Sequence, residues 1–369
     1  MTTTESPTPT TTTTATARPV DPDRLMTFVF KAVDEVGATL NTALVVMGDK
    51  LGYYRLMADG VPITAADLAE RSDTGLPYAR EWLNAQAAGG YVDYDPRSGT
   101  YTLPAEQAVA LTDENSPLYL PGFFQIAHGT TRDAHRIVDA ARSGDGVGWH
   151  EHNDDVHTGC ERFFRPGYNA NLVQQWLPAL DGVVEKLEAG ARVADIGCGH
   201  GASTVLMAQA FPGSRFLGSD FHAASVDVAR RRAEEAGVGD RVGFRTASAT
   251  TFDGGPFDLV TTFDALHDMG DPIGAARHVH DVLDDDGTWM VVEPAAGDHV
   301  EDNLNPVGRA YYGFSTLLCT PNSLSQEVGM ALGTQAGPAR IRDVTTAAGF
   351  TRFRVVAQTP FNLVFEVRK

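Results

Sequence analysis

The chain has 369 residues, of which 43% are hydrophobic and 21% are charged, and its formal net charge is −19. A chain of this length exceeds what one compact core usually holds, so we expect more than one domain. The strong negative charge disfavours a general affinity for nucleic acid or for an anionic membrane surface. The three cysteines are widely separated and odd in number, so the sequence predicts neither a disulfide framework nor a zinc knuckle.

The beginning of the sequence has no pattern of an export signal. A charged stretch followed by an apolar one is absent there, and no run of about 18 apolar residues occurs in the chain. We therefore expect a cytoplasmic protein. Residues 1–20 are mostly Thr, Pro, Ser and Ala, which cannot bury enough apolar surface to offset the entropy lost on ordering. This composition predicts a disordered tail.

Residues 21–116 have the element order of a winged helix. Apolar residues at helical spacing over residues 28–45 predict a long first helix. Two shorter helices follow, one beginning after the N-cap Thr64 and the other covering Leu76–Ala88. Two alternating runs joined by residues 95–99 then predict a hairpin.

A winged helix either binds DNA or has been recruited for dimerisation or for covering a substrate. Residues 21–116 hold 7 Lys or Arg side chains against 15 Asp or Glu side chains. The helix in the recognition position offers only Arg80 as a cation, and the hairpin offers only Arg97. Contact with phosphates usually takes several cations on one face, so the charge favours a dimerisation or capping domain over DNA binding.

Residues 117–185 are expected to form connecting helices, covering Leu118–Ala141 and Phe163–Leu180. Between them, residues 148–157 carry three histidines and two aspartates that are possible metal ligands. No helical i,i+4 histidine pair or other recognised ligand spacing is present, so we expect no metal site. We instead take this stretch, with His150, as a loop that faces the substrate, since connecting loops often carry function.

From Ala191 onward the pattern changes to strands that alternate with helices, which predicts an α/β fold with a parallel sheet covered on both faces. The expected parallel strands are Arg192–Ile196, Ser214–Asp220, Arg241–Thr246, Phe257–Phe263 and Gly287–Val292. The last two strands, Arg352–Ala357 and Asn362–Arg368, are too close for a crossover helix and must form an antiparallel hairpin. The predicted sheet is therefore Rossmann-like, has seven strands and is closed by one reversed strand.

An insert over residues 297–337 separates the fifth strand from its return helix, Ile341–Ala348. It is longer than a connection requires, so we expect a lid over the substrate. Tyr311, Tyr312, Phe314 and Leu318 give the insert an apolar face. The first three of them, together with His150, are the candidate substrate contacts. The alternative is that this face packs on the connecting helices.

Three glycines at alternate positions, Gly197, Gly199 and Gly201, follow the first strand of the sheet. Glycines at such a corner let the backbone approach a ligand, but they also satisfy a loose dinucleotide pattern and are a weak signal alone. Asp195, two positions before the first glycine, offers a carboxylate to an ammonium group of a ligand. Asp220, at the end of the second strand, offers one to ribose hydroxyls.

Together with a His267–Asp268 site after the fourth strand and the reversed hairpin, these features resemble the class I S-adenosylmethionine-dependent methyltransferases over residues 186–369. The resemblance implies S-adenosylmethionine as cofactor and S-adenosylhomocysteine as product. The residues that it assigns to the cofactor are Asp195, Gly197, Cys198, Gly199, Gly201, Asp220, Phe221, Ser248, Ala249, Phe263 and Tyr168. In the family an acidic residue often meets the adenine where this chain has Ser248.

The whole arrangement resembles O-methyltransferases with an N-terminal winged-helix dimerisation domain. Nearly the full chain resembles actinobacterial winged-helix methyltransferases often labelled transcriptional regulators, on the motifs Phe163–Tyr168, Leu317–Ser325, Ala331–Gly337 and Thr359–Leu363. This resemblance implies a homodimer that methylates an oxygen of a small, partly apolar acceptor. It also implies His267 as general base, oriented by Glu293, although Met269 stands where the family usually has Trp. Methyl transfer by positioning alone, without a base, is the alternative role of this site.

Two other functions stay open at this point. The first is a transcriptional regulator that binds S-adenosylmethionine as effector and DNA through the winged helix. The second is an enzyme that uses the same cofactor without transferring its methyl group.

Overall fold

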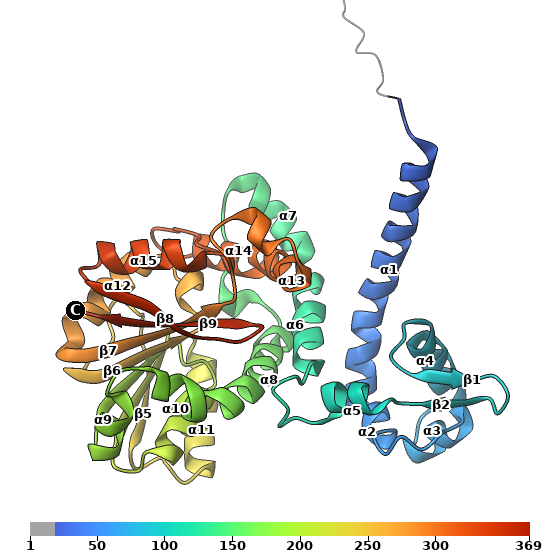
Figure 1. Ribbon diagram of the computed structural model, residues 1–369, viewed down its shortest axis with the longest axis horizontal. Helices are drawn as coiled ribbons and strands as arrows, with labels where there is room; N and C mark the ends of the chain where they lie inside the picture. The colour runs from blue at the N-terminus through green and yellow to red at the C-terminus, as the bar shows by residue number, and fades with distance from the viewer. Residues whose placement is uncertain (1–18) are drawn as a thin grey trace, which may run out of the picture.

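The computed structural model describes residues 19–369. Residues 1–18 of the expected tail therefore lie outside the described residues. Figure 1 shows a small helical part and a larger α/β part, joined by helices that run between them. None of the described helices is long and apolar enough to cross a membrane.

The helical part has the predicted order of a long helix, a helix pair and a hairpin. Its elements are α1 (Pro22–Lys50), α2 (Tyr53–Leu56), α3 (Ala65–Arg71), α4 (Leu76–Ala88), β1 (Asp93–Asp95), β2 (Thr100–Thr102) and α5 (Ala105–Thr112). Thr64 and Asp67 form the capping box that starts α3. Trp82 of α4 is buried against Tyr53 and Tyr54 and donates to the Leu44 carbonyl at 2.9 Å. The end of α1 is therefore fixed to the helix pair.

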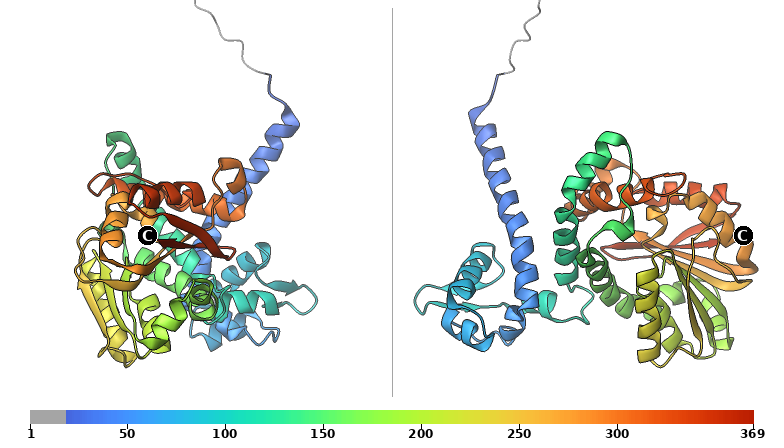
Figure 2. Two further views of the ribbon diagram at one scale, coloured as in Figure 1. Left: turned by 60° about the vertical axis from the view of Figure 1, so that its left-hand side comes forward. Right: turned by 180° about the vertical axis from the view of Figure 1, so that it is seen from behind.

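The first part of α1 is largely exposed, although Glu35 forms an ion pair with Arg309 of the insert. Both views in Figure 2 show its N-terminal turns extending away from the small part and from the α/β part. Large apolar side chains on these turns are more than half exposed, among them Val33, Val36 and Leu40. Removing such side chains from water is favourable, so a partner that covered them would gain free energy of binding.

The connecting segments differ from the prediction in two places. They consist of α6 (Pro121–Arg132), α7 (Ala134–Ser143), α8 (Asp154–Asn171) and α9 (Val183–Ala189), with a π turn (Leu172–Trp176) after α8. The single helix expected over 118–141 is broken at Asp133, whose carboxylate accepts from His152 and Asn153. Asn153 also caps α8 by accepting from the Asp155 amide, so this helix begins inside the expected loop.

The larger part contains the predicted seven-stranded sheet. Its strands are β3 (Arg192–Ile196), β4 (Arg215–Asp220), β5 (Val242–Thr246), β6 (Phe257–Phe263), β7 (Leu283–Pro294), β8 (Arg352–Gln358) and β9 (Asn362–Arg368). They lie in the order β5-β4-β3-β6-β7-β9-β8. Strand β9 pairs antiparallel with both β7 and β8, while the pairs among β3 to β7 are parallel. The predicted fold class, with one reversed strand, is confirmed.

Helices cover both faces of this sheet, as expected for parallel strands. One face packs on the π turn and on α9, α10 (Ala202–Ala210) and α11 (Ala223–Glu235). The other packs on α12 (Pro272–Val282) and α15 (Gly337–Ala347). The predicted insert forms α13 (Pro306–Phe314), a second π turn (Ser315–Cys319) and α14 (Thr320–Leu324).

Candidate active site

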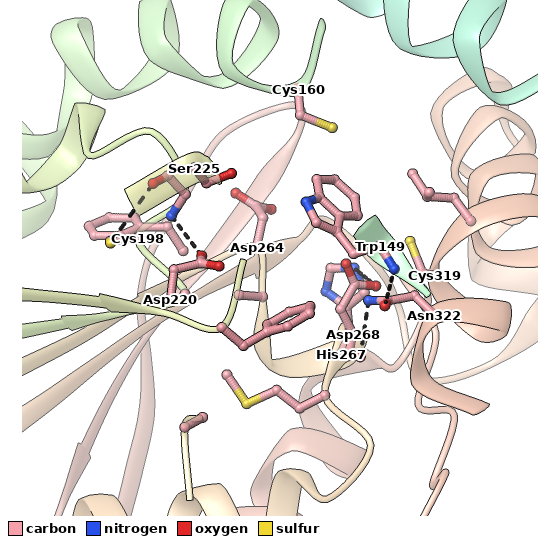
Figure 3. Close-up of a pocket in the computed structure, with 18 of the residues that line it drawn as sticks. Trp149, Cys160, Cys198, Asp220, Ser225, Asp264, His267, Asp268, Cys319 and Asn322 are labelled. Carbon is pink, nitrogen blue, oxygen red and sulfur yellow. Dashed lines mark hydrogen bonds and ion pairs between the residues drawn. The ribbon is translucent and has the colours of Figure 1, made fainter. Parts of the chain in front are cut away.

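A cavity of about 970 Å³ lies at the carboxyl ends of β3, β4 and β6. Its walls come from the sheet, from α6 and α8, and from the insert. Figure 3 shows Cys198 and Asp220 at one end of it, His267, Asp268 and Cys319 at the other, and Asp264 between them. In sheets of parallel strands, the crevice at the carboxyl ends of the strands is a common ligand-binding site.

The glycine turn lies at the first end of the cavity. Gly197, Gly199 and Gly201 all have positive φ, at 73°, 51° and 74°. A Cβ on Gly201 would lie 2.9 Å from atoms of Phe244 and Ala229, so a side chain does not fit there. The turn thus needs glycine for both its conformation and its packing, and it presents backbone to the cavity.

Asp220 is held beside this turn by the backbone. One carboxylate oxygen accepts from the Gly199 amide at 2.9 Å and the other from the His222 amide at 2.8 Å. Burial raises the pKa of the Asp220 carboxyl above its ordinary value, although both amides favour the charged form. The fixed carboxylate lines the cavity and retains free lone pairs for hydroxyl groups of a ligand.

Asp195 differs from its expected role as a direct contact to an ammonium group. It is 1% exposed and does not line the cavity. Its carboxylate accepts from the hydroxyls of Ser203 at 2.7 Å, Thr204 at 2.5 Å and Thr261 at 3.0 Å. These bonds connect β3 to the start of α10 and to β6, so Asp195 supports the glycine turn from behind.

Asp264 is a half-buried carboxyl that was not selected from the sequence. It follows β6, lines the cavity and has φ 48°, which is uncommon for a residue other than glycine. Asn362 donates to it at 2.7 Å and the Tyr168 hydroxyl at 3.4 Å. Burial and the neighbouring Glu293 charge hold the pKa of Asp264 well above its ordinary value. A cationic group of a ligand would compensate this carboxyl.

The other residues expected at the cofactor are placed along the same end. Cys198, Phe221, Ser248, Ala249, Phe263 and Tyr168 all line the cavity. The Ser248 hydroxyl lies 3.0 Å from that of Thr250. The lining residues 247–250 carry no carboxylate, unlike the acidic residue that the family often has here. The rings of Tyr168 and Phe263 lie 5.1 Å apart and form an apolar wall.

His267 and Glu293 form a buried pair at the second end of the cavity. Nδ1 of His267 lies 2.6 Å from Oε2 of Glu293, and Oε1 of Glu293 accepts from the Leu266 amide at 3.0 Å. Both residues are 3% exposed, but His267 lines the cavity. Burial disfavours the imidazolium, yet the Glu293 and Asp268 carboxylates outweigh this and hold the pKa of His267 well above its ordinary value.

The expected substrate residues are only partly brought together. Tyr311 and Phe314 line the cavity, whereas Tyr312 lines a separate small hollow within the insert, and His150 lines neither. Tyr312 faces away because α13 presents only one side to the cavity. In place of His150, its neighbour Trp149 reaches the cavity.

Several apolar residues at this end were not selected from the sequence. They come from α6, from the short helix over Trp149–Glu151 and from α8, and they are Phe123, Trp149, Cys160 and Phe163. Apolar residues in helices are usual core residues as well, so no local signal separates these side chains from the core. Leu318 of the second π turn, expected on the apolar face of the insert, also lines the cavity.

Two family models match separate parts of the chain. Residues 194–289 match a methyltransferase domain, and residues 39–113 match an Rv2258c-like winged HTH domain. The chain therefore joins a winged HTH domain to a methyltransferase domain, as its resemblance implied.

Curated relatives match over less than a third of the chain. The ubiquinone biosynthesis O-methyltransferase of Ruegeria pomeroyi is 34% identical over 99 residues, which cover 27% of this chain and 39% of that protein. The demethylmenaquinone methyltransferase of Thermus thermophilus is 31% identical over 115 residues, 31% of this chain and 51% of that protein. The chain thus spans about half or less of the length of these relatives.

Solved structures match over nearly the whole chain. Mitomycin 7-O-methyltransferase is 19% identical with a TM-score of 0.69, covering 95% of this chain and 100% of that chain. Human N-acetylserotonin methyltransferase, solved with S-adenosylmethionine, is 16% identical with a TM-score of 0.66, covering 95% and 99%. At these identities the likeness establishes the fold, including the small helical part.

Proposed function

We propose that this protein, a methyltransferase domain joined to a winged HTH domain, transfers the methyl group of S-adenosylmethionine to a hydroxyl of a small, partly apolar acceptor. The observation that carries the proposal is one cavity with a glycine turn at one end and the buried His267–Glu293 pair at the other. The three free cysteines suit a reducing cytoplasm, where we place the activity.

The residues of the first end fit this cofactor. Asp220 would accept from the ribose hydroxyls, because both its oxygens are already oriented by backbone amides. Asp264, rather than the enclosed Asp195, would face the ammonium group of the methionine part. Phe221, Ser248 and Ala249 would border the adenine, and Phe263 and Tyr168 would form the wall beside it. S-adenosylmethionine, when bound, supplies a methyl group made electrophilic by the sulfonium.

His267 is placed to act as the general base. When the ring is neutral and its Nδ1 proton is donated to Glu293, Nε2 carries a lone pair at the cavity, 3.4 Å from Oδ1 of Asp268. Nε2 takes the proton of the acceptor hydroxyl while that oxygen forms a bond to the methyl carbon and the carbon–sulfur bond breaks. Glu293 holds the ring in this orientation and stabilises the imidazolium that results.

The acceptor end favours an aromatic or otherwise flat apolar molecule. Phe123 stacks on Phe163 with ring centroids 4.5 Å apart, and Phe314 lies 5.4 Å from Phe123. Trp149 and Leu318 extend this surface toward His267. Apolar walls with one base suit an acceptor that carries a hydroxyl on an apolar skeleton.

The proposal is tested by incubating the protein with methyl-labelled S-adenosylmethionine and fractionated metabolites of the host. We expect label in an acceptor whose mass rises by one CH₂, together with S-adenosylhomocysteine. Product without added mass would instead favour a non-methylating enzyme. Unchanged transfer by His267→Ala would remove the base assignment but leave the methyltransferase.

We also propose that the chain forms a homodimer through its N-terminal part. The exposed apolar side chains of α1, with Val33 and Val36 at 62% and 61% exposure, offer a surface that a second copy can cover. Val33→Asp with Val36→Asp should therefore convert the dimer into a folded monomer in light scattering. Lys31→Asp, on another side of α1, is the matched control. An unchanged dimer would place the interface elsewhere.

The charges of the winged part do not favour the regulator alternative. Arg80 pairs with Glu81 at 3.1 Å, and Arg97 with Asp95 at 3.5 Å. Both cations of the recognition helix and hairpin are thus next to acidic groups, in a part that is acidic overall. Salt-dependent DNA binding that is lost in Arg80→Ala with Arg97→Ala would support the regulator instead.

A further inference from the structure

Three side chains of different chemistry converge at the His267 end of the cavity. Nε2 of His267, a carboxylate oxygen of Asp268 and Sγ of Cys319 lie within 4.8 Å of one another. All three residues line the cavity, and Figure 3 shows them together beside Trp149 and Asn322. Imidazole, carboxylate and thiolate are the ligands that Zn²⁺ takes in proteins.

The contact between His267 and Asp268 lacks a natural hydrogen-bond donor when the imidazole is neutral. Nδ1 then donates to Glu293, so Nε2 presents a lone pair, and it lies 3.4 Å from Oδ1 of Asp268. Oδ1 is shielded from solvent and has no hydrogen-bond partner among the described residues. Two acceptors that face each other in a buried place call for a proton or another cation between them.

The spacing fits a tetrahedral metal ion. Zn–N and Zn–O bonds of about 2.0–2.1 Å place two such ligands about 3.3 Å apart. The observed 3.4 Å between Nε2 and Oδ1 agrees with this value. Sulfur lies about 3.5 Å from its neighbours in such sites, and Sγ of Cys319 lies within 4.8 Å of both other ligand atoms.

The surroundings also have the features of a metal site. Metal-bound histidines almost always donate their other N–H to a carboxylate or carbonyl, and His267 does so to Glu293. Three protein ligands leave a fourth position, which here opens into the cavity.

The segments that carry the three ligands are held together before any ion binds. Gln326 donates to the Asp268 carbonyl at 2.9 Å, and Ser323 donates to the Met269 carbonyl at 2.8 Å. Cys319 lies at the end of the π turn that leads into α14, and Ser323 belongs to α14. Pre-arranged ligands lose less entropy when they bind an ion.

We propose that His267, Asp268 and Cys319 form a binding site for a thiophilic divalent cation such as Zn²⁺. The ion binds Nε2, one carboxylate oxygen and the thiolate. The Cys319 thiol releases its proton to solvent, and so does Nε2 of His267 where the ring is protonated. No oxidation or reduction takes place. Because the ion occupies the Nε2 lone pair, it also blocks the general base, a consequence that rests on the proposed function.

Zinc binding is measured directly, by titrating the metal-free full-length chain with Zn²⁺ against a chromophoric chelator. We expect one ion per chain, with affinity at least tenfold weaker in Cys319→Ser and in Asp268→Asn. Cys160→Ser is the matched control, because Cys160 lines the cavity outside the trio, and it should bind as the original chain does. Equal affinity in Cys319→Ser and the original chain, or no binding by the original chain, would overturn the site.

Cobalt supplies a signature that a change of fold would not imitate. Co²⁺ in place of Zn²⁺ should give a thiolate charge-transfer band in the original chain and in Cys160→Ser, and none in Cys319→Ser. An unchanged band in Cys319→Ser would contradict the assignment. Thermal unfolding midpoints identify any variant that has failed to fold. If Cys319→Ser does not fold, the Zn²⁺ affinity of Asp268→Asn tests the site in its place.

The effect on methyl transfer is a separate measurement. Zn²⁺ should inhibit transfer by the original chain at concentrations near its measured dissociation constant, and a chelator should restore it. Full transfer with the site occupied would refute the blocked base but not the binding site. If no transfer is found at all, the titration still decides the metal site independently of the proposed function.

Discussion

The two ends of the cavity are built in different ways. At the glycine end, the cavity is bordered by one short stretch of backbone, residues 197–200, and by Asp220, which two backbone amides orient. At the His267 end, the walls are side chains from α6, α8 and the insert, which are far apart in the sequence. The end of a cavity that is built around one short motif can be recognised from the sequence. An end whose walls come from distant segments can be recognised only from the tertiary fold.

This difference means that the proposed cofactor site and the proposed acceptor site are built from separate sets of residues. Backbone contacts change little when side chains are substituted, so the first end can keep one cofactor across many sequences. The second end can change its apolar side chains without disturbing the glycine turn, which lets one fold serve different acceptors. The two ends should therefore respond independently to substitution.

Among the substitutions considered, His267→Gln should give the largest difference between its effect on methyl transfer and its effect on cofactor binding. Loss of the base should lower kcat by about 10²- to 10⁴-fold. The affinity for S-adenosylhomocysteine should stay unchanged, because His267 lies at the opposite end from the glycine turn. Steady-state kinetics and calorimetry measure both, with the exposed His135→Gln as control. A kcat close to that of the original chain would mean that positioning alone carries the transfer.

A smaller effect, confined to the cofactor end, is expected for Asp264→Asn. Hydrogen bonds to charged groups contribute about 1.5–3 kcal/mol, so S-adenosylhomocysteine should bind roughly 10- to 100-fold more weakly. Methylthioadenosine has no ammonium group and should bind both proteins equally. If both ligands weaken alike, Asp264 shapes the cavity and does not meet the ammonium group.

The smallest effect is a shift of the pH profile in Glu293→Gln. Methyl transfer needs neutral His267, and the Glu293 carboxylate holds the pKa of His267 well above its ordinary value. The rate should therefore rise with pH through the neutral range. Removing this negative charge destabilises the imidazolium, so the rising limb should move to lower pH while the maximal rate falls. A limb that stays in place would separate Glu293 from the base.

The sequence predicted the fold and the glycine end because both leave local patterns. Alternating strand and helix periods indicated the parallel sheet, and the short link before Asn362 indicated its reversed strand. Asp264 was missed because its importance comes from a positive φ and from Asn362 and Tyr168, which only the fold brings near it. His150 was selected from a histidine-rich stretch, although its neighbour Trp149 reaches the cavity.

The expected contact of Asp195 shows a different limit. Its position two residues before the glycines is that of the family, but position alone does not show what a carboxylate accepts. Ser203, Thr204 and Thr261 supply hydroxyls to it from α10 and β6. A buried carboxylate with three donors is a support for the turn, which only the packed structure makes visible.

Calorimetric titration of S-adenosylhomocysteine tests the central claim, that the glycine turn holds the cofactor, most directly. The original chain should bind one equivalent. Gly201→Val should bind none, because it fills space next to Phe244 and strains a positive φ. Gly243→Ala, at a strand position with open space around the added Cβ, should bind as the original chain does. Binding of equal affinity by folded Gly201→Val, or no binding by the original chain, would contradict the account.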